Sequence, residues 1–168
     1  MDSVFRELFN ATERSAVHLE MRDVYDANDS VYQDWRKGVA FDPAERWPDW
    51  FGQVAAAVAR GVAIRRARIV SEPVSEYVRY EYDVTAGLNI ASGEQVRWLP
   101  RRKATDLSLP GNDFWVFDGT AAVINHFDGN GSWIAEESAN DPALVDFLQA
   151  AFDRVWARAT DHESYRIP

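Results

Sequence analysis

The chain has 168 residues, of which 46% are hydrophobic and 27% charged, a balance typical of a globular protein. It contains no cysteine, which excludes disulfides, thiolate chemistry and Cys-ligated zinc or iron–sulfur clusters. Its net charge of −9 opposes phosphate binding over the whole surface, so we expect no direct contact with nucleic acid. A chain well below about 250 residues fits one core, and a single domain over residues 1–168 is expected.

The sequence indicates a protein of the cytoplasm. No apolar run approaches the roughly 20 residues that a membrane-spanning helix needs, so we expect no membrane contact. The acidic start at Met1, Asp2 and Ser3 lacks the basic and apolar regions of a signal peptide. The absence of cysteine fits a reducing compartment.

Residues 1–48 are predicted to form a helical and aromatic segment packed on the core. Apolar residues at roughly helical spacing predict a helix over residues 3–27. On that helix His18 has no second histidine four residues away, so a zinc motif is absent. Residues 28–48 turn at two X-Pro steps and carry four aromatic side chains, which favours attachment to the core over disorder.

Residues 49–160 are predicted to form an α/β core. A helix over 49–60 ends at Gly61, and the alternating residues 62–70 predict a strand. A helix follows over 71–89, with Pro73 in its first turn, and then a strand over 95–99.

The clearest local signal is a hairpin whose strands, 113–117 and 120–127, flank Asp118-Gly119. Residues 132–137 read as another strand, and a helix from Asp141 presents one broad apolar face. The fold class expected is therefore a single α/β domain, in which helices flank a mixed sheet with a parallel central pair and an antiparallel hairpin.

The middle of this acidic chain has an excess of basic residues. Residues 60–103 carry 9 basic and 5 acidic side chains, whereas both flanking stretches are acidic. Planar cations and aromatic walls are typical of sites for anionic or nucleotide-like ligands, so we expect an arginine-lined cleft as one candidate. Its candidate residues are Arg66, Arg68, Tyr77, Arg79, Tyr80 and Arg97. The alternative is internal pairing of Arg66 and Arg68 with Glu72, Glu76 or Glu81.

The stretch Gly111–Gly119 resembles the core of the phospholipase D superfamily, whose pattern is His-x-Lys-x-x-x-x-Asp before a turn and a further strand. The resemblance covers about residues 50–160 and implies a half-domain of that fold with an extra N-terminal helix. It places the family's aspartate on Asp118, its histidine on Gly111 and its lysine on Asp113. The family's imidazole attacks phosphorus and its lysine holds the phosphate charge, so the resemblance implies a degenerate member without that chemistry.

Two further residues are candidates on the hairpin. His126 lies near Asp128 and, in combination with Asp118, offers a general base or a metal ligand. The alternative is an ordinary histidine at a strand end. No pattern of metal ligands supports the first reading, so we expect neither a metal nor another cofactor.

Three sequence segments, residues 16–25, 50–80 and 93–101, resemble the actinobacterial domain-of-unknown-function family 6879. That family has no established activity, and its members are commonly encoded beside helix-turn-helix regulators and small partner proteins. The resemblance implies a non-enzymatic regulatory or toxin–antitoxin-like protein that acts through a protein partner. The alternative is a sensor or enzyme that binds a small anionic molecule. Seven tryptophans and nine phenylalanines are many for one small core, so a homodimer is a further expectation.

Overall fold

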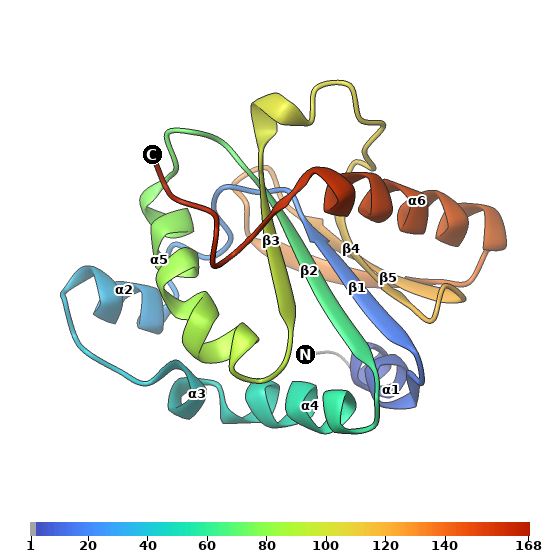
Figure 1. Cartoon of the computed structure of the whole chain (residues 1–168), viewed down its shortest axis with the longest axis horizontal. Helices are drawn as coiled ribbons and strands as arrows, with labels where there is room; N and C mark the ends of the chain where they lie inside the picture. The colour runs from blue at the N-terminus through green and yellow to red at the C-terminus, as the bar shows by residue number, and fades with distance from the viewer. Residues whose placement is uncertain (1–2) are drawn as a thin grey trace.

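The computed structural model describes residues 3–168, which form one mixed sheet with helices on both faces (Figure 1). The sheet has seven strands in the order β6-β5-β4-β1-β2-β3-β7. The strands are β1 (Ser15–Glu20), β2 (Ala63–Val70), β3 (Gln95–Pro100), β4 (Asp113–Phe117), β5 (Ala121–Phe127), β6 (Trp133–Ala139) and β7 (Thr160–Asp161). The α-helices are α1 (Ser3–Ala11), α2 (Ser30–Arg36), α3 (Pro43–Arg46), α4 (Pro48–Ala59), α5 (Glu76–Thr85) and α6 (Pro142–Arg158).

The strand directions confirm the predicted mixed sheet. Strands β1, β2 and β3 are parallel neighbours, and β4, β5, β6 and β7 each pair antiparallel with an adjacent strand. The predicted hairpin is β4 and β5, with Asp118 at a φ of 51° in its turn. None of the described helices is long and apolar enough to cross a membrane.

The prediction of one helix over residues 3–27 was wrong. Helix α1 ends at Ala11, and residues 15–20 form β1, the strand between β2 and β4. Ala16 and Leu19 fit helical spacing, but the stretch also alternates with period two. Both faces of β1 are buried, so its polar residues His18 and Glu20 do not mark a solvent-exposed face as they would in a half-exposed strand. The first 48 residues therefore supply a central strand as well as helices.

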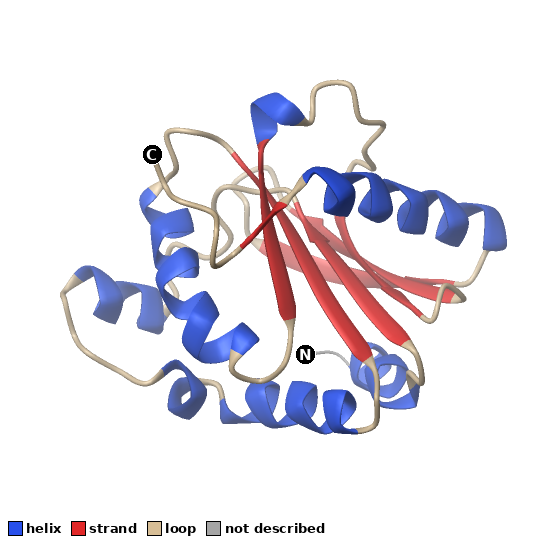
Figure 2. Cartoon of the chain, in the orientation of Figure 1, coloured by secondary structure: helices blue, strands red, loops and turns tan. Residues whose placement is uncertain are grey.

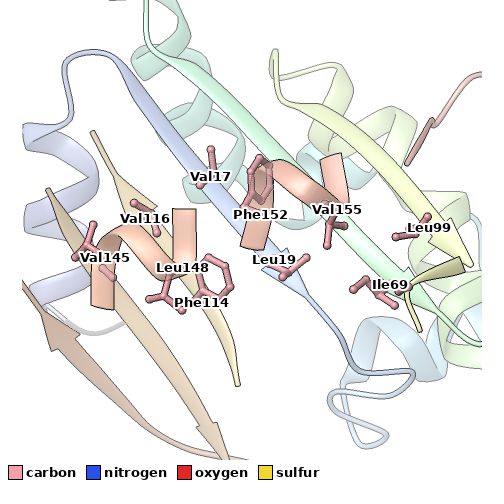
Figure 3. Close-up of a cluster of buried hydrophobic side chains, with 13 residues drawn as sticks. Val17, Leu19, Ile69, Leu99, Phe114, Val116, Val145, Leu148, Phe152 and Val155 are labelled. Carbon is pink, nitrogen blue, oxygen red and sulfur yellow. The ribbon is translucent and has the colours of Figure 1, made fainter. Parts of the chain in front are cut away.

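Helix α6 covers one face of the sheet. Its Val145, Leu148 and Phe152 pack against apolar side chains of β1, β2, β3 and β4 (Figure 3). Asp141 caps the helix by accepting a hydrogen bond from the Leu144 backbone N–H, and Pro142 occupies the first turn, as the sequence predicts. This face is a continuous hydrophobic core.

The opposite face carries α1, α4 and α5 (Figure 2). Phe5 and Phe9 of α1 pack with Val54 and Ala57 of α4 on one part of the sheet. Val78 of α5 packs with strand residues on another part. The sheet residues between these two apolar clusters are charged, and the candidate site lies there.

Helix α5 begins later than the sequence predicts and ends in an unusual turn. Pro73 lies outside the helix, and Ser75 caps it by accepting from the Val78 backbone N–H. After Thr85 the chain continues as a π-helix, η1 (Ala86–Ile90). A short 3-10 helix, η2 (Arg101–Lys103), follows β3.

Candidate functional site

Alternation along the central strands places five polar or aromatic side chains on the face opposite α6. His18 and Glu20 come from β1, Arg66 and Arg68 from β2, and Trp115 from β4. Successive strand residues point to opposite faces, so their apolar neighbours Val17, Leu19, Ala67 and Phe114 join the α6 core instead. All five side chains are buried.

Glu20 is the centre of a buried ion-pair network. One carboxylate oxygen, Oε1, pairs with Arg66, and the other, Oε2, accepts from Arg68 Nε at 2.5 Å. Arg66 Nε also donates to Glu94 at 2.6 Å, and Arg68 Nη1 donates to the Thr85 hydroxyl at 2.6 Å. Burial alone would raise the pKa of Glu20, but the two guanidinium groups outweigh it and hold that pKa well below its usual range.

His18 is fixed at both ring nitrogens. Its Nδ1 donates to the Phe114 carbonyl oxygen at 2.8 Å, and its Nε2 lies 3.2 Å from Glu20 Oε1. The imidazole stacks on the Trp115 indole, with 4.3 Å between ring centroids and 8° between planes. This ring is therefore oriented by its neighbours rather than free to act as a nucleophile.

A pocket of about 390 Å³ lies above this network. On α5, Tyr77, Tyr80, Glu81 and Val84 recur at spacings of three and four residues, so they share the helical face that lines the pocket. Residues 22–47, which we call the roof segment, contribute Tyr25, Asp29 and Trp47. The volume lies within the range of small-molecule sites.

Glu81 differs from the other carboxyl groups of the pocket. Its residue is 9% exposed, and its carboxyl group makes no hydrogen bond or ion pair with any residue that the structure describes. Burial raises the pKa of Glu81 to about 8; Arg68 opposes the increase and Glu20 adds to it.

Asp113 stands where the phospholipase D resemblance places a lysine. It is buried at the start of β4, where it accepts from the Met21 backbone N–H at 3.0 Å and from the Tyr25 hydroxyl. Burial raises its pKa, although the Tyr25 hydrogen bond opposes the change. Asp113 lines a hollow that adjoins the main pocket, and Gly111 lies exposed beside it, lining another hollow.

The structure brings together four of the predicted site residues and separates the others. Arg66, Arg68, Tyr77 and Tyr80 all line the pocket. The arginines are also internally paired, with Glu20 and Glu94 rather than with the carboxylates nearer in sequence. Arg79 is exposed on α5. Arg97 lies on the other face of the sheet. Its guanidinium group lies over the Trp156 ring and donates a hydrogen bond to Asp161.

Asp118 and His126 lie at opposite ends of the β4–β5 hairpin, so they do not form a joint site. The Asp118 carboxylate accepts backbone N–H bonds from Glu13, Arg14 and Ser15 at 2.8–2.9 Å. Burial acts to raise its pKa, but these bonds outweigh it and lower the pKa. His126 Nε2 lies 2.9 Å from Glu137 of β6.

Replacing Asp118 by asparagine is expected to lower the free energy of unfolding by about 2 kcal/mol, because three backbone donors lose an ionised acceptor. Asparagine tolerates the positive φ of this turn, so the loss reports the hydrogen bonds rather than backbone strain. Urea denaturation checks the value, with Asp128→Asn as the control in the neighbouring turn. An unchanged midpoint for Asp118→Asn would contradict this role.

Within residues 3–168, no group of three or more His, Asp or Glu side chains is placed to hold a metal ion. The pocket is lined by charged and aromatic side chains. Sequence reasoning missed His18, Glu20, Glu81 and Trp115 as members of this site.

The arrangement of strands and helices is that of the phospholipase D fold. The structure is similar to that of Nuc from Salmonella typhimurium, a phospholipase D family member, with a TM-score of 0.54 and 14% identity over 97% of this chain and 89% of that one. It also aligns, with a TM-score of 0.49 and 12% identity, over 94% of its length with 49% of TrmBL2, an archaeal chromatin protein. No curated protein matches the sequence.

The family model for the domain of unknown function DUF6879 matches residues 3–167. The chain belongs to that family.

Proposed function

We propose that this chain is a non-enzymatic regulatory protein that binds a small organic molecule in the pocket on the sheet face. The observation that carries the proposal is the pocket's construction on a preformed network. Glu20 holds His18 and both arginines in place, and Trp115 supports His18 by stacking. A site whose side chains are already ordered loses little entropy when a ligand binds.

The residues at the phospholipase D positions support binding over catalysis. Gly111 has no side chain that can attack phosphorus, and Asp113 repels a phosphate where that family has a cation. His18 cannot replace the missing nucleophile, because both of its nitrogens face fixed partners. We therefore propose that the chain is a degenerate member of this fold.

The roof segment supplies a route from the pocket to the surface. Its Tyr25 and Asp29 line the pocket, while its Trp35 donates from the indole N–H to Asp83 on the exposed side of α5. A ligand that bound one arrangement of the roof segment more tightly than another would shift the segment toward that arrangement. Such coupling would suit a protein that reports a ligand to a protein partner.

A thermal-shift screen of small aromatic compounds that are cationic, neutral or anionic tests ligand binding. A compound present at 100 times its dissociation constant is expected to stabilise the chain by about 2.7 kcal/mol. Val84→Phe fills the pocket and is expected to abolish the shift, whereas Val39→Phe at an exposed position keeps it.

Circular dichroism establishes that the blocked variant is folded. Should Val84→Phe not fold, Leu88→Phe lines the same pocket and makes the same test. The proposal is wrong if no compound of any charge stabilises the parent chain, or if the folded blocked variant responds as the parent does.

A further inference from the structure

The lining of the pocket carries more acidic than basic groups. Four carboxyl groups line it, from Glu20, Asp29, Glu81 and Glu136, against the guanidinium groups of Arg66 and Arg68. Glu94 adds another carboxylate behind Arg66. The arginines are therefore neutralised within the protein and do not leave a net positive cleft for an anion.

Glu81 is the carboxyl group that this network leaves available. Glu20 is held by both arginines, and Asp29 accepts from the Val31 backbone N–H at 2.9 Å and the Tyr80 hydroxyl at 3.2 Å. Glu81 is nine-tenths buried and lines the pocket; within residues 3–168 it makes no close ion pair, and Arg68 acts on it only through its charge. A ligand cation that pairs with this largely desolvated carboxyl group gains more than one that pairs with a carboxylate in water.

Aromatic rings line the same pocket. Tyr77 and Tyr80 precede Glu81 on the pocket face of α5, and their ring centroids lie 5.5 Å apart. Trp47 and Trp50 contribute indole rings from the start of α4. The faces of such rings carry negative potential and attract cations, most strongly where water is excluded.

We infer that the pocket binds an organic cation, with an ammonium or amidinium group paired to Glu81 and an apolar or planar body among the tyrosine and tryptophan rings. This inference rests on the proposed function, since it names the chemical class of the ligand for that same pocket. It replaces the anion suggested by the count of arginines.

Proton linkage gives the inference a second observable. The charged groups that act most strongly on Glu81 are Glu20 of β1, Arg66 and Arg68 of β2, and Asp113 of β4. With its pKa raised to about 8 by burial, Glu81 is mostly protonated at pH 7 in the free chain. A cation pairs with the ionised form and releases that proton, so its affinity rises by up to about tenfold per pH unit below the pKa.

Three indole compounds of similar shape test how the charge of the ligand affects its affinity: tryptamine (cationic), tryptophol (neutral) and indole-3-propionate (anionic). Isothermal titration calorimetry with the full chain is expected to show tryptamine binding at least about tenfold more tightly than tryptophol, with indole-3-propionate weakest. Tryptamine affinity is expected to increase from pH 6.5 to 7.5, and that of tryptophol to stay within about twofold.

Glu81→Gln keeps the shape of the protonated side chain and is expected to remove both the preference for tryptamine and its pH dependence. The matched control is Glu76→Gln on the same helix, because Glu76 pairs with Arg36 outside the pocket and is half-exposed. The control is expected to bind all three probes as the parent does.

The outcomes distinguish this inference from the proposal on which it rests. If indole-3-propionate binds as tightly as tryptamine, or if Glu81→Gln keeps the cation preference, the pocket is a ligand site but the inference is wrong. If neither these probes nor any library compound binds, both the proposed function and the inference are overturned.

Discussion

Replacing Glu20 by glutamine is expected to lower the free energy of unfolding by about 3–5 kcal/mol. The glutamine side chain fits the same space, but within residues 3–168 it leaves Arg68 without an ion-pair partner and Arg66 with the Glu94 carboxylate alone. Glu20 is 7% exposed, so water cannot replace the lost charge without opening the sheet face. Urea denaturation measured at neutral pH checks the value.

The matched control is Glu137→Gln, which removes a carboxylate from the pair with His126. The Glu137 side chain is 62% exposed, so we expect a change below about 1 kcal/mol. A loss for Glu20→Gln no larger than that of the control would mean that water reaches the two guanidinium groups, and the preformed network would have to be abandoned.

The pH dependence of stability is expected to differ between the parent chain and Glu81→Gln. Folding raises the pKa of Glu81 from the ordinary 4.5 to about 8, so between these values the folded chain holds a proton that the unfolded chain has released. The stabilisation is complete below pH 4.5 and is lost as the pH rises through 8. The parent therefore loses up to about 1.4 kcal/mol per pH unit relative to the variant, a few kcal/mol in all.

Urea denaturation of both chains at intervals between pH 5 and pH 8.5 measures this difference. Other groups also titrate in the window; for example, burial lowers the pKa of His162, which acts with the opposite sign. These contributions are common to both chains and cancel in the comparison. A constant difference across the window would show that Glu81 ionises as an exposed carboxyl does.

The elements with clear local signals were predictable, and the central strand was not. The turn residues Asp118-Gly119 and the cap Asp141-Pro142 determine their structures within a few positions, so the hairpin and α6 were confirmed. Strand β1 depends on neighbours distant in sequence, because His18 and Glu20 are stable inside only when Arg66, Arg68 and Trp115 surround them. Read alone, those polar residues suggested the exposed side of a helix.

The candidate site could be predicted in part for the same reason. The alternation of Arg66 and Arg68, followed by a helix with Tyr77 and Tyr80, placed these four side chains together. The pairing of the arginines was not readable, because Glu20 and Glu94 lie 46 and 28 residues from Arg66 along the chain. The sign of the pocket's charge therefore depends on contacts that only the folded chain brings together.

The π-helical turn after α5 makes the network sensitive to chain length. Asn89, within η1, donates from Nδ2 to Glu94 Oε2 at 2.6 Å, and Glu94 in turn holds Arg66. The wide turn accommodates one residue more than an α-helix would. Deleting a single residue there would rotate Asn89 by roughly 100° about the helix axis and detach it from Glu94. Insertions and deletions are usually tolerated between helices and strands, but here they would change the lining of the pocket directly.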